Sequence, residues 1–301
     1  MLTTSHAITH PATLLHQLIA RGGPSVQEYA SLTSATQELY AAYLAGEYSA
    51  VDLQVLQSSF SDDCLAQTLH GHSIRKPFGY AGDFLIIDKI YRQHVTTDER
   101  YANWDRLWHH LDATKAVRNR KDYFKSLMTR QLATGKSLQL LNVASGPARD
   151  LAELYGMINP AQLHTTCIEA DERAIAYART LNAGHIDQIN FIQQNIFRYD
   201  AAGSYDIVWS AGLFDYFTDS VFVKILRRFM RWTKPGGEII VGNFSDTNPS
   251  QGFMELFGDW FLHHRSAATL EALALEAGAR KEQVSIAQEA AGVNLFLHIK
   301  L

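Results

Sequence analysis

Cysteine is almost absent from this chain, and its scarcity excludes two common classes of architecture. The 301 residues include only Cys64 and Cys167, which lie far apart and form no CxxC pair. That spacing supports neither a zinc ribbon nor a disulfide framework. Both side chains are expected to be small buried apolar groups, as in proteins of a reducing compartment.

Long apolar runs and an excess of basic residues are also lacking. No apolar segment approaches the roughly 20 residues that span a bilayer, and the first six residues lack the positive start and apolar run of a signal peptide. A cytoplasmic protein without a membrane span is therefore expected. The formal net charge of -4 provides no general basic face for phosphates, so nucleic acid is not an expected partner.

The chain does have an ordinary globular composition, with 47% hydrophobic and 19% charged residues, and enough length for one large or two moderate domains. Residues 1–130 are predicted to form an all-helical N-terminal cap domain, because their apolar residues suit helical spacing and β-branched runs are few. The expected helices cover residues 29–44, 51–56, 64–69, 84–91, 101–111 and 116–132.

The second half, residues 131–301, alternates between short apolar runs and helical patterns. Strands are expected at residues 138–143, 164–168, 189–192, 205–210, 238–242 and 295–299. Helices are expected at residues 150–155, 171–181, 219–232 and 267–277, with Gly236 and Gly237 closing the helix before the fifth strand. This alternation predicts an α/β fold with a mostly parallel, Rossmann-like sheet and helices on both faces.

Two polar features follow the first two strands of the predicted sheet. The first strand runs into Ala144-Ser145-Gly146-Pro147-Ala148, where small residues let backbone N–H groups approach a ligand. Such a turn is a weak signal alone. Glu169 lies at the end of the second strand, 23 residues after Gly146. This separation is close to the ~20 residues expected between such a loop and an acid that accepts both hydroxyls of a ribose.

Residues 140–150, 167–179, 191–196, 205–213 and 234–241 together resemble the successive motifs of class I S-adenosylmethionine (SAM)-dependent methyltransferases. The resemblance covers about half of the chain and implies SAM as the cofactor. By this likeness, Glu169 holds the ribose hydroxyls, Asn195 accepts from the adenine amino group and Ile196 donates its N–H there. The remaining cofactor contacts that the resemblance implies are made by Ala144, Ser145, Gly146, Ala170 and Ala211.

The sequence departs from the usual glycine-rich loop of that family at two positions. Ala144 and Ala148 stand where glycines are common, and alanine is expected to fit only if φ is negative there. The same loss of glycine disfavours NAD, whose pyrophosphate needs a closer approach. Arg118 and Arg120 lie just before the Rossmann-like half and could supply a cation for the SAM carboxylate, or belong to a solvated helix face.

Two unusual segments are the candidates for substrate recognition. In residues 75–83, Tyr80 offers a donor and Asp83 an acceptor, and Asp83 is also a candidate N-cap of the following helix. The segment 243–265 follows the fifth strand, is long for a connection and mixes aromatic with polar residues. It predicts a substrate loop or lid. The candidate substrate-binding residues are Tyr216, Asn243, Trp260 and Arg265.

The stretches GYAGD, GNFSDTNP and MELFGDWFLHHR narrow the resemblance to a bacterial methyltransferase group associated with biosynthesis of 3-hydroxypalmitic acid methyl ester, a quorum-sensing signal. That likeness implies methyl transfer to a carboxylate oxygen of a small, partly apolar metabolite. A carboxylate is already ionised at neutral pH and needs no general base. Arg265 or Arg75 could hold it through a bidentate contact.

Other acceptors lead to other roles. A hydroxyl or amine acceptor in a secondary metabolite would need a base, for which the candidates are His263, His264, His72 and Asp83; Tyr80, Asp83 and His263 are the predicted catalytic residues. His70-Gly71-His72 has a metal-like spacing without a second cluster, so no metal is expected. A non-catalytic SAM-binding regulatory protein is a third hypothesis, and a homodimer is left open as a partner state.

Overall fold

The computed structural model describes residues 9–201 and 205–301, which divide into two compact units. One unit contains the described residues up to Lys115 together with Pro249–Phe261, and the other contains Ala116–Asn248 with Leu262–Leu301. The division therefore falls about fifteen residues before the predicted boundary at 130/131, and a later segment returns to the first unit. The two units are described separately below.

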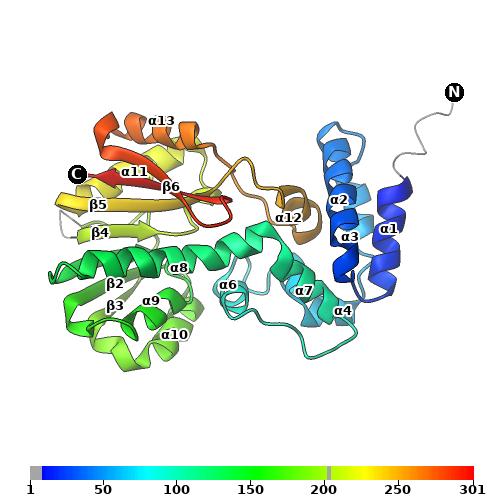
Figure 1. Cartoon of the computed structure of the whole chain (residues 1–301), viewed down its shortest axis with the longest axis horizontal. Coiled ribbons are helices and arrows are strands. Elements are labelled where there is room, and N and C mark those ends of the chain that lie inside the picture. Colours follow the sequence, from blue (N-terminus) through cyan, green and yellow to red (C-terminus); the bar gives the residue numbers. More distant parts are fainter. Residues whose placement is uncertain (1–8, 202–204) are drawn as a thin grey trace. The chain divides into compact units, whose positions relative to one another are not determined.

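The first unit is all-helical, as predicted for the N-terminal half. Its helices are α1 (Thr9–Ala20), α2 (Tyr29–Leu44), α3 (Ala50–Gln57), α4 (Asp62–Gln67), α5 (Leu69–Arg75), α6 (Phe84–Tyr91), α7 (Ala102–His110) and α12 (Gln251–Gly258). α12 lies beside α2 (Figure 1) and is tied to the unit by the Tyr40 hydroxyl, which donates to Glu255 over 3.0 Å. α12 is thus part of the helical unit although it follows the fifth strand in the sequence.

The second unit is built on a seven-stranded sheet in the order β3-β2-β1-β4-β5-β7-β6. β1 to β5 are parallel, whereas β7 is antiparallel to both β5 and β6. The strands are β1 (Leu138–Val143), β2 (Leu163–Glu169), β3 (Ile189–Gln193), β4 (Tyr205–Ser210), β5 (Thr233–Phe244), β6 (Val284–Gln288) and β7 (Asn294–Lys300). The strand order reverses between β1 and β4, so their carboxyl ends form the expected ligand edge.

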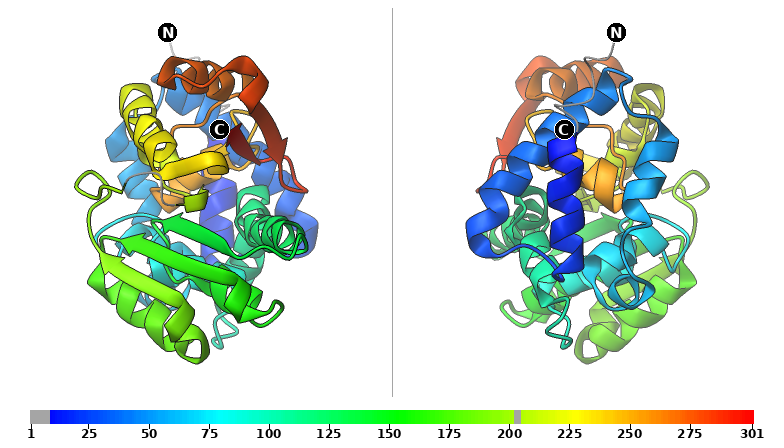
Figure 2. Two further views of the ribbon diagram at one scale, coloured as in Figure 1. Left: turned by 90° about the vertical axis from the view of Figure 1, so that its left-hand side faces the viewer. Right: turned by 90° about the vertical axis from the view of Figure 1, so that its right-hand side faces the viewer.

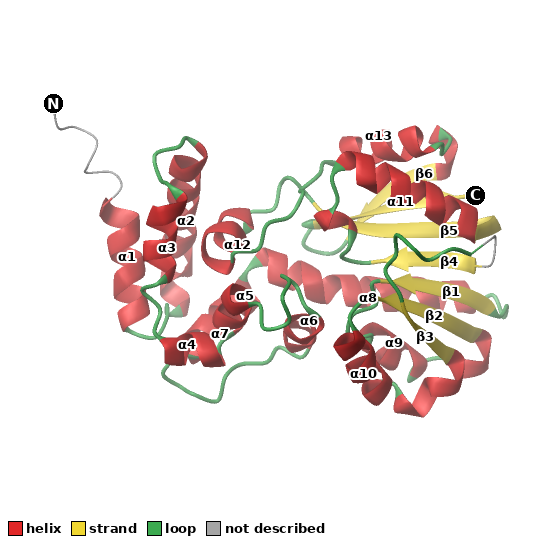
Figure 3. Cartoon of the chain, turned by 180° about the vertical axis from the view of Figure 1, so that it is seen from behind, coloured by secondary structure: helices red, strands yellow, loops and turns green. Residues whose placement is uncertain are grey.

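Helices cover both faces of this sheet (Figure 3). α8 (Asp112–Leu132), α9 (Arg149–Tyr155) and α10 (Glu172–Leu181) pack on one face through side chains such as Phe124, Leu151 and Ala178. α11 (Asp219–Trp232) and α13 (Ala267–Ala277) pack on the other through Phe222, Leu226 and Leu270. Figure 2 shows the same layers end-on. The predicted Rossmann-like α/β fold is confirmed.

Two sequence-based expectations about this sheet were wrong or incomplete. The edge strand β6 was not predicted, because its half-exposed residues VSIAQ form no continuous apolar run. Gly236 and Gly237 do not close α11, which ends at Trp232; both glycines lie within β5. Gly237 is needed there for close approach, since a Cβ would lie 2.8 Å from the Asp206 carbonyl oxygen.

No helix within residues 9–201 and 205–301 has the length and apolar character needed to cross a membrane.

Candidate cofactor site

The loop after β1 adopts an unusual backbone conformation. Ala144, Gly146 and Ala148 have φ values of 54°, 53° and 49°, all in the left-handed region. The expectation of negative φ at the two alanines is therefore wrong: they occupy glycine-like positions and keep that conformation at a cost of roughly 1–2 kcal/mol each. The N–H groups of these three residues donate within the protein, to the Ile168 carbonyl, the Glu169 carboxylate and the Ser145 carbonyl.

Glu169 stands at the carboxyl end of β2 and faces this loop. Its Oε2 accepts the Gly146 N–H over 2.9 Å, and its Oε1 accepts the N–H groups of Ala170 and Asp171 over 2.7 and 3.1 Å. Burial raises the pKa of Glu169, while these three N–H donors oppose that shift. A Cβ placed on Gly146 would meet nothing within 4 Å, so open space adjoins the backbone whose N–H the carboxylate accepts. The arrangement fits a polyol such as ribose.

The other predicted adenosine contacts lie at the ends of neighbouring strands. Asn195 is exposed in the turn after β3, and its Oδ1 accepts the N–H of Phe197 over 2.9 Å. Ile196 beside it is buried. Ala170 is exposed after β2, and Ala211 follows β4. These four positions share the carboxyl edge of the sheet with Glu169, although their adenine contacts stay predictions.

Arg120 projects from α8 to the end of β4. A Cβ on Gly212 would lie only 2.8 Å from the Arg120 Nη1, so the guanidinium lies directly against the backbone there. Arg120 is buried and also acts electrostatically on two buried carboxyls, Asp150 and Asp215. Arg118, two residues earlier in α8, is half-buried, and burial lowers its pKa. Arg120 is the better placed of the two for a SAM carboxylate.

Sequence reasoning missed the two acids beside Arg120. Asp150 lies in the first turn of α9 and accepts the N–H of Leu151, and Asp215 follows β4 and accepts the Phe244 N–H over 2.6 Å. Burial raises the pKa of each carboxyl to about 6, an effect that Arg120 partly offsets. The available signal was their position, because both acids closely follow a strand that ends at the ligand edge.

The structure corrects two predicted substrate residues. Arg265 is buried, and its guanidinium donates to Asp219, to Asn243 and to the carbonyl oxygens of Phe214 and Phe217. The side-chain amide of Asn243, which is also fully buried, donates to the carbonyl oxygens of Phe244 and His263. Both side chains hold loops together, so neither is free to bind a substrate carboxylate.

Two other predicted residues of this unit are accessible. Tyr216 is 41% exposed in the short turn Phe214–Tyr216 after β4. His263 is exposed, and its backbone N–H donates to the Asp215 carbonyl over 2.7 Å. The Asp215 and Asn243 contacts thus fix the His263 backbone while its ring stays accessible.

The remaining predicted residues belong to the helical unit. Asp83 is buried; its carboxylate caps α6 by accepting the N–H groups of Leu85 and Ile86 and pairs with His72 Nε2 at 2.8 Å. The N-cap prediction is confirmed. Tyr80 is 38% exposed, whereas Trp260 is buried. Arg75, the alternative carboxylate ligand, pairs with Asp62 at 2.8 Å.

Comparisons with known proteins agree with this fold. Residues 140–237 match a family described as a methyltransferase domain. No curated protein sequence matches the chain significantly. A structure from Bordetella parapertussis, described as a possible exported protein, has 18% identity and a TM-score of 0.63, with 100% of this chain and 99% of that chain covered.

A suggested O-methyltransferase from Nostoc punctiforme has 13% identity and a TM-score of 0.52, with 98% of this chain and 94% of that chain covered. A magnesium protoporphyrin IX methyltransferase from Synechocystis, solved with bound S-adenosylhomocysteine (SAH), has 13% identity and a TM-score of 0.49 over 63% of this chain and 87% of its own. The chain therefore carries a methyltransferase domain with the class I fold, as the sequence motifs predicted.

Proposed function

We propose that this protein transfers a methyl group from SAM to an oxygen of a small, partly apolar metabolite. The observation that carries the proposal is the Glu169 carboxylate at the end of β2, which accepts the N–H of Gly146 where that backbone borders open space. A carboxylate in this position accepts both hydroxyls of a ribose. Arg120 would meet the opposite, anionic end of the methionine part of SAM.

Between the two acceptor oxygens, a hydroxyl is favoured over a carboxylate. A carboxylate acceptor would require a cation, and Arg265 is used inside the protein by Asp219, Asn243 and backbone carbonyls. Bound SAM supplies an electrophilic methyl group. As the new O–CH3 bond forms and the S–CH3 bond breaks, the electron pair returns to sulfur and the hydroxyl proton must go to a base, for which exposed His263 is our candidate.

A calorimetric titration with SAH tests the cofactor site directly. We expect wild-type binding and a loss of affinity of about tenfold or more in Glu169→Ala, because hydrogen bonds to a charged group contribute about 1.5–3 kcal/mol. Glu172→Ala is the matched control, since Glu172 is exposed at the start of α10. Equal SAH affinity in both variants would reject the assigned role of Glu169, and no binding to the wild type would reject SAM.

The acceptor is identified by incubating the enzyme with SAM and matched hydroxy fatty acids, phenols and amines, followed by mass spectrometry. An O-methyl ether supports our proposal. A methyl ester would instead support the carboxylate chemistry implied by the 3-hydroxypalmitate group. SAH binding without turnover of any substrate would favour a regulatory SAM-binding protein. The cytoplasmic location and the homodimer also remain proposals, to be tested by fractionation and light scattering.

A further inference from the structure

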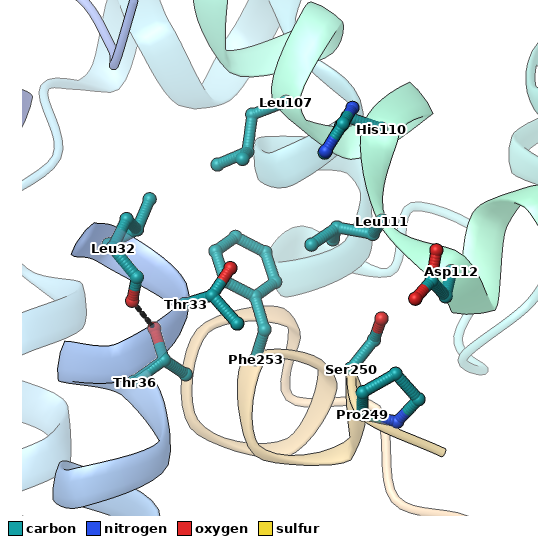
Figure 4. Close-up of a pocket in the computed structure, with 10 residues that line it drawn as sticks. All are labelled: Leu32, Thr33, Thr36, Leu107, His110, Leu111, Asp112, Pro249, Ser250 and Phe253. Atoms are coloured by element: carbon teal, nitrogen blue, oxygen red, sulfur yellow. Dashed lines mark hydrogen bonds between the residues drawn. The ribbon is translucent and has the colours of Figure 1, made fainter. Parts of the chain in front are cut away.

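The helical unit contains a small pocket that no predicted site residue lines (Figure 4). Its volume is about 90 Å³, and its apolar walls come from Leu32 of α2, Leu107 and Leu111 at the end of α7, and Phe253 of α12. The Phe253 ring makes an edge-to-face contact with Trp108, the ring centroids 6.1 Å apart. Apolar cavities of about 150 Å³ hold benzene, so this pocket fits a hydrocarbon chain of about four carbons.

The polar groups of the pocket are mainly acceptors. The Thr36 hydroxyl donates its proton to the Leu32 carbonyl over 2.8 Å, and the Thr33 hydroxyl donates to the Tyr29 carbonyl over 2.9 Å. With those protons committed, each oxygen offers only lone pairs. A ligand group that donates hydrogen bonds therefore fits these two positions better than one that only accepts.

The charged residues of the lining also favour a ligand group that donates hydrogen bonds. Asp112 is the one acidic residue among the ten lining residues, and none of them is lysine or arginine. His110 lines the pocket with its ring tilted by 45° against that of Tyr29, the centroids 4.7 Å apart, and partial burial lowers its pKa. Lys115 pairs with Asp112 at 2.8 Å and reduces the negative charge without reversing it. A carboxylate would meet no cation in this lining.

We propose that this pocket binds a short hydrocarbon chain bearing a hydroxyl or ammonium group. The pocket excludes anionic chains of equal length, because an acceptor-rich, weakly acidic lining gives a carboxylate no compensation for lost water.

The test is an NMR titration of the full-length protein, without SAM, using n-butylamine, 1-butanol and butyrate at millimolar concentrations. We expect saturable shifts at pocket residues with the amine and the alcohol, and at least about tenfold weaker binding of butyrate. Binding of butyrate as tightly as the amine, or no saturable shift with either donor, would overturn the proposal.

Two conservative substitutions locate the binding. Asp112→Asn should lower the affinity for butylamine about two- to fivefold, as expected for the loss of an exposed ion pair. The affinity for butanol should stay unchanged. Its control is Asp122→Asn, because Asp122 makes the same i,i+3 pair with Lys125 on the same helix at 2.9 Å. Thr36→Val should lower the affinity for both butylamine and butanol. Its control is Thr180→Val, since the Thr180 hydroxyl makes the same hydrogen bond to the carbonyl four residues earlier on an exposed helix face. Equal effects in test and control variants would contradict this location.

Discussion

Ala144 is the residue at which local strain in the cofactor loop is easiest to measure. It is exposed and has a φ of 54°, so Ala144→Gly relieves a left-handed alanine and removes no buried methyl group. The relief of roughly 1–2 kcal/mol exceeds the ~0.4–1 kcal/mol of entropy that glycine adds to the unfolded chain. We therefore expect Ala144→Gly to raise the free energy of unfolding, measured in urea, by up to about 1 kcal/mol.

The matched control is Ala161→Gly, which lies exposed in the short 3-10 turn Pro160–Gln162. There the substitution relieves no strain and should destabilise the protein by about 0.5–1 kcal/mol. If both glycine variants lose stability equally, the left-handed alanine is not strained as we argue.

Asp215 should make stability depend on pH in a defined window. Burial raises its pKa from an ordinary 3.8 to about 6, so between these values the folded state holds a proton that the unfolded state has lost. The contribution of Asp215 to stability is therefore greatest below pH 4 and declines as the pH rises to about 6. The full shift corresponds to about 3 kcal/mol.

Asp215→Asn removes this titration and can still accept the Phe244 N–H. We expect urea unfolding at pH 4 and pH 7 to show that the free energy of unfolding of the variant, relative to the wild type, is higher at pH 7 than at pH 4 by up to about 3 kcal/mol. Asp206→Asn, at the opposite end of β4 and half-buried, is the control. A difference between variant and wild type that does not change with pH would contradict the assignment.

At the scale of elements, two substitutions of Asp83, the N-cap of α6, distinguish its structural role from its predicted catalytic role. Asp83→Asn keeps an oxygen for the N–H groups of Leu85 and Ile86, whereas Asp83→Ala removes the cap and the carboxylate that pairs with Nε2 of buried His72. We expect Asp83→Ala to lose about 2–4 kcal/mol of stability. A catalytic base would instead show as a fall in kcat of about 100-fold or more in Asp83→Asn at nearly unchanged Tm.

The strand β5 approaches its neighbour so closely that it requires glycine. A Cβ on Gly242 would lie 2.4 Å from the Ala211 carbonyl oxygen, and both residues lie at the cofactor edge. We expect Gly242→Ala to lower stability by about 1–3 kcal/mol and to weaken SAH binding, measured by thermal unfolding and calorimetry. Gly184→Ala, where a Cβ meets nothing within 4 Å, should change neither.

For the whole molecule, the domain boundary can be tested by two fragments. Residues 116–301 keep most of α8, whose Phe124 and Met128 are fully buried in the sheet core, whereas residues 131–301 lose both. We expect the longer fragment to unfold cooperatively and the shorter one to be largely unfolded, as judged by circular dichroism. Equal cooperativity would support the boundary at residue 130 that the sequence suggested.

Periodicity in the sequence was sufficient to predict six of the seven strands and the helices α8, α9, α10, α11 and α13, because buried strands and amphipathic helices leave strong local patterns. Glu169 could be predicted for the same reason: a strand end is visible in the sequence. β6 could not, since a half-exposed edge strand resembles a loop.

The sequence by itself determined the α/β class, the order of the motifs and Glu169 at the cofactor edge, because each depends on residues close together in the chain. Only the tertiary structure decided that Arg265 and Asn243 hold loops, that Asp150 and Asp215 lie beside Arg120, and that α12 packs with the helical unit. Those outcomes depend on partners far away in the sequence. They also depend on burial, which local pattern does not record. The left-handed φ of Ala144 belongs with them, since surrounding structure maintains a backbone that its own residue type disfavours.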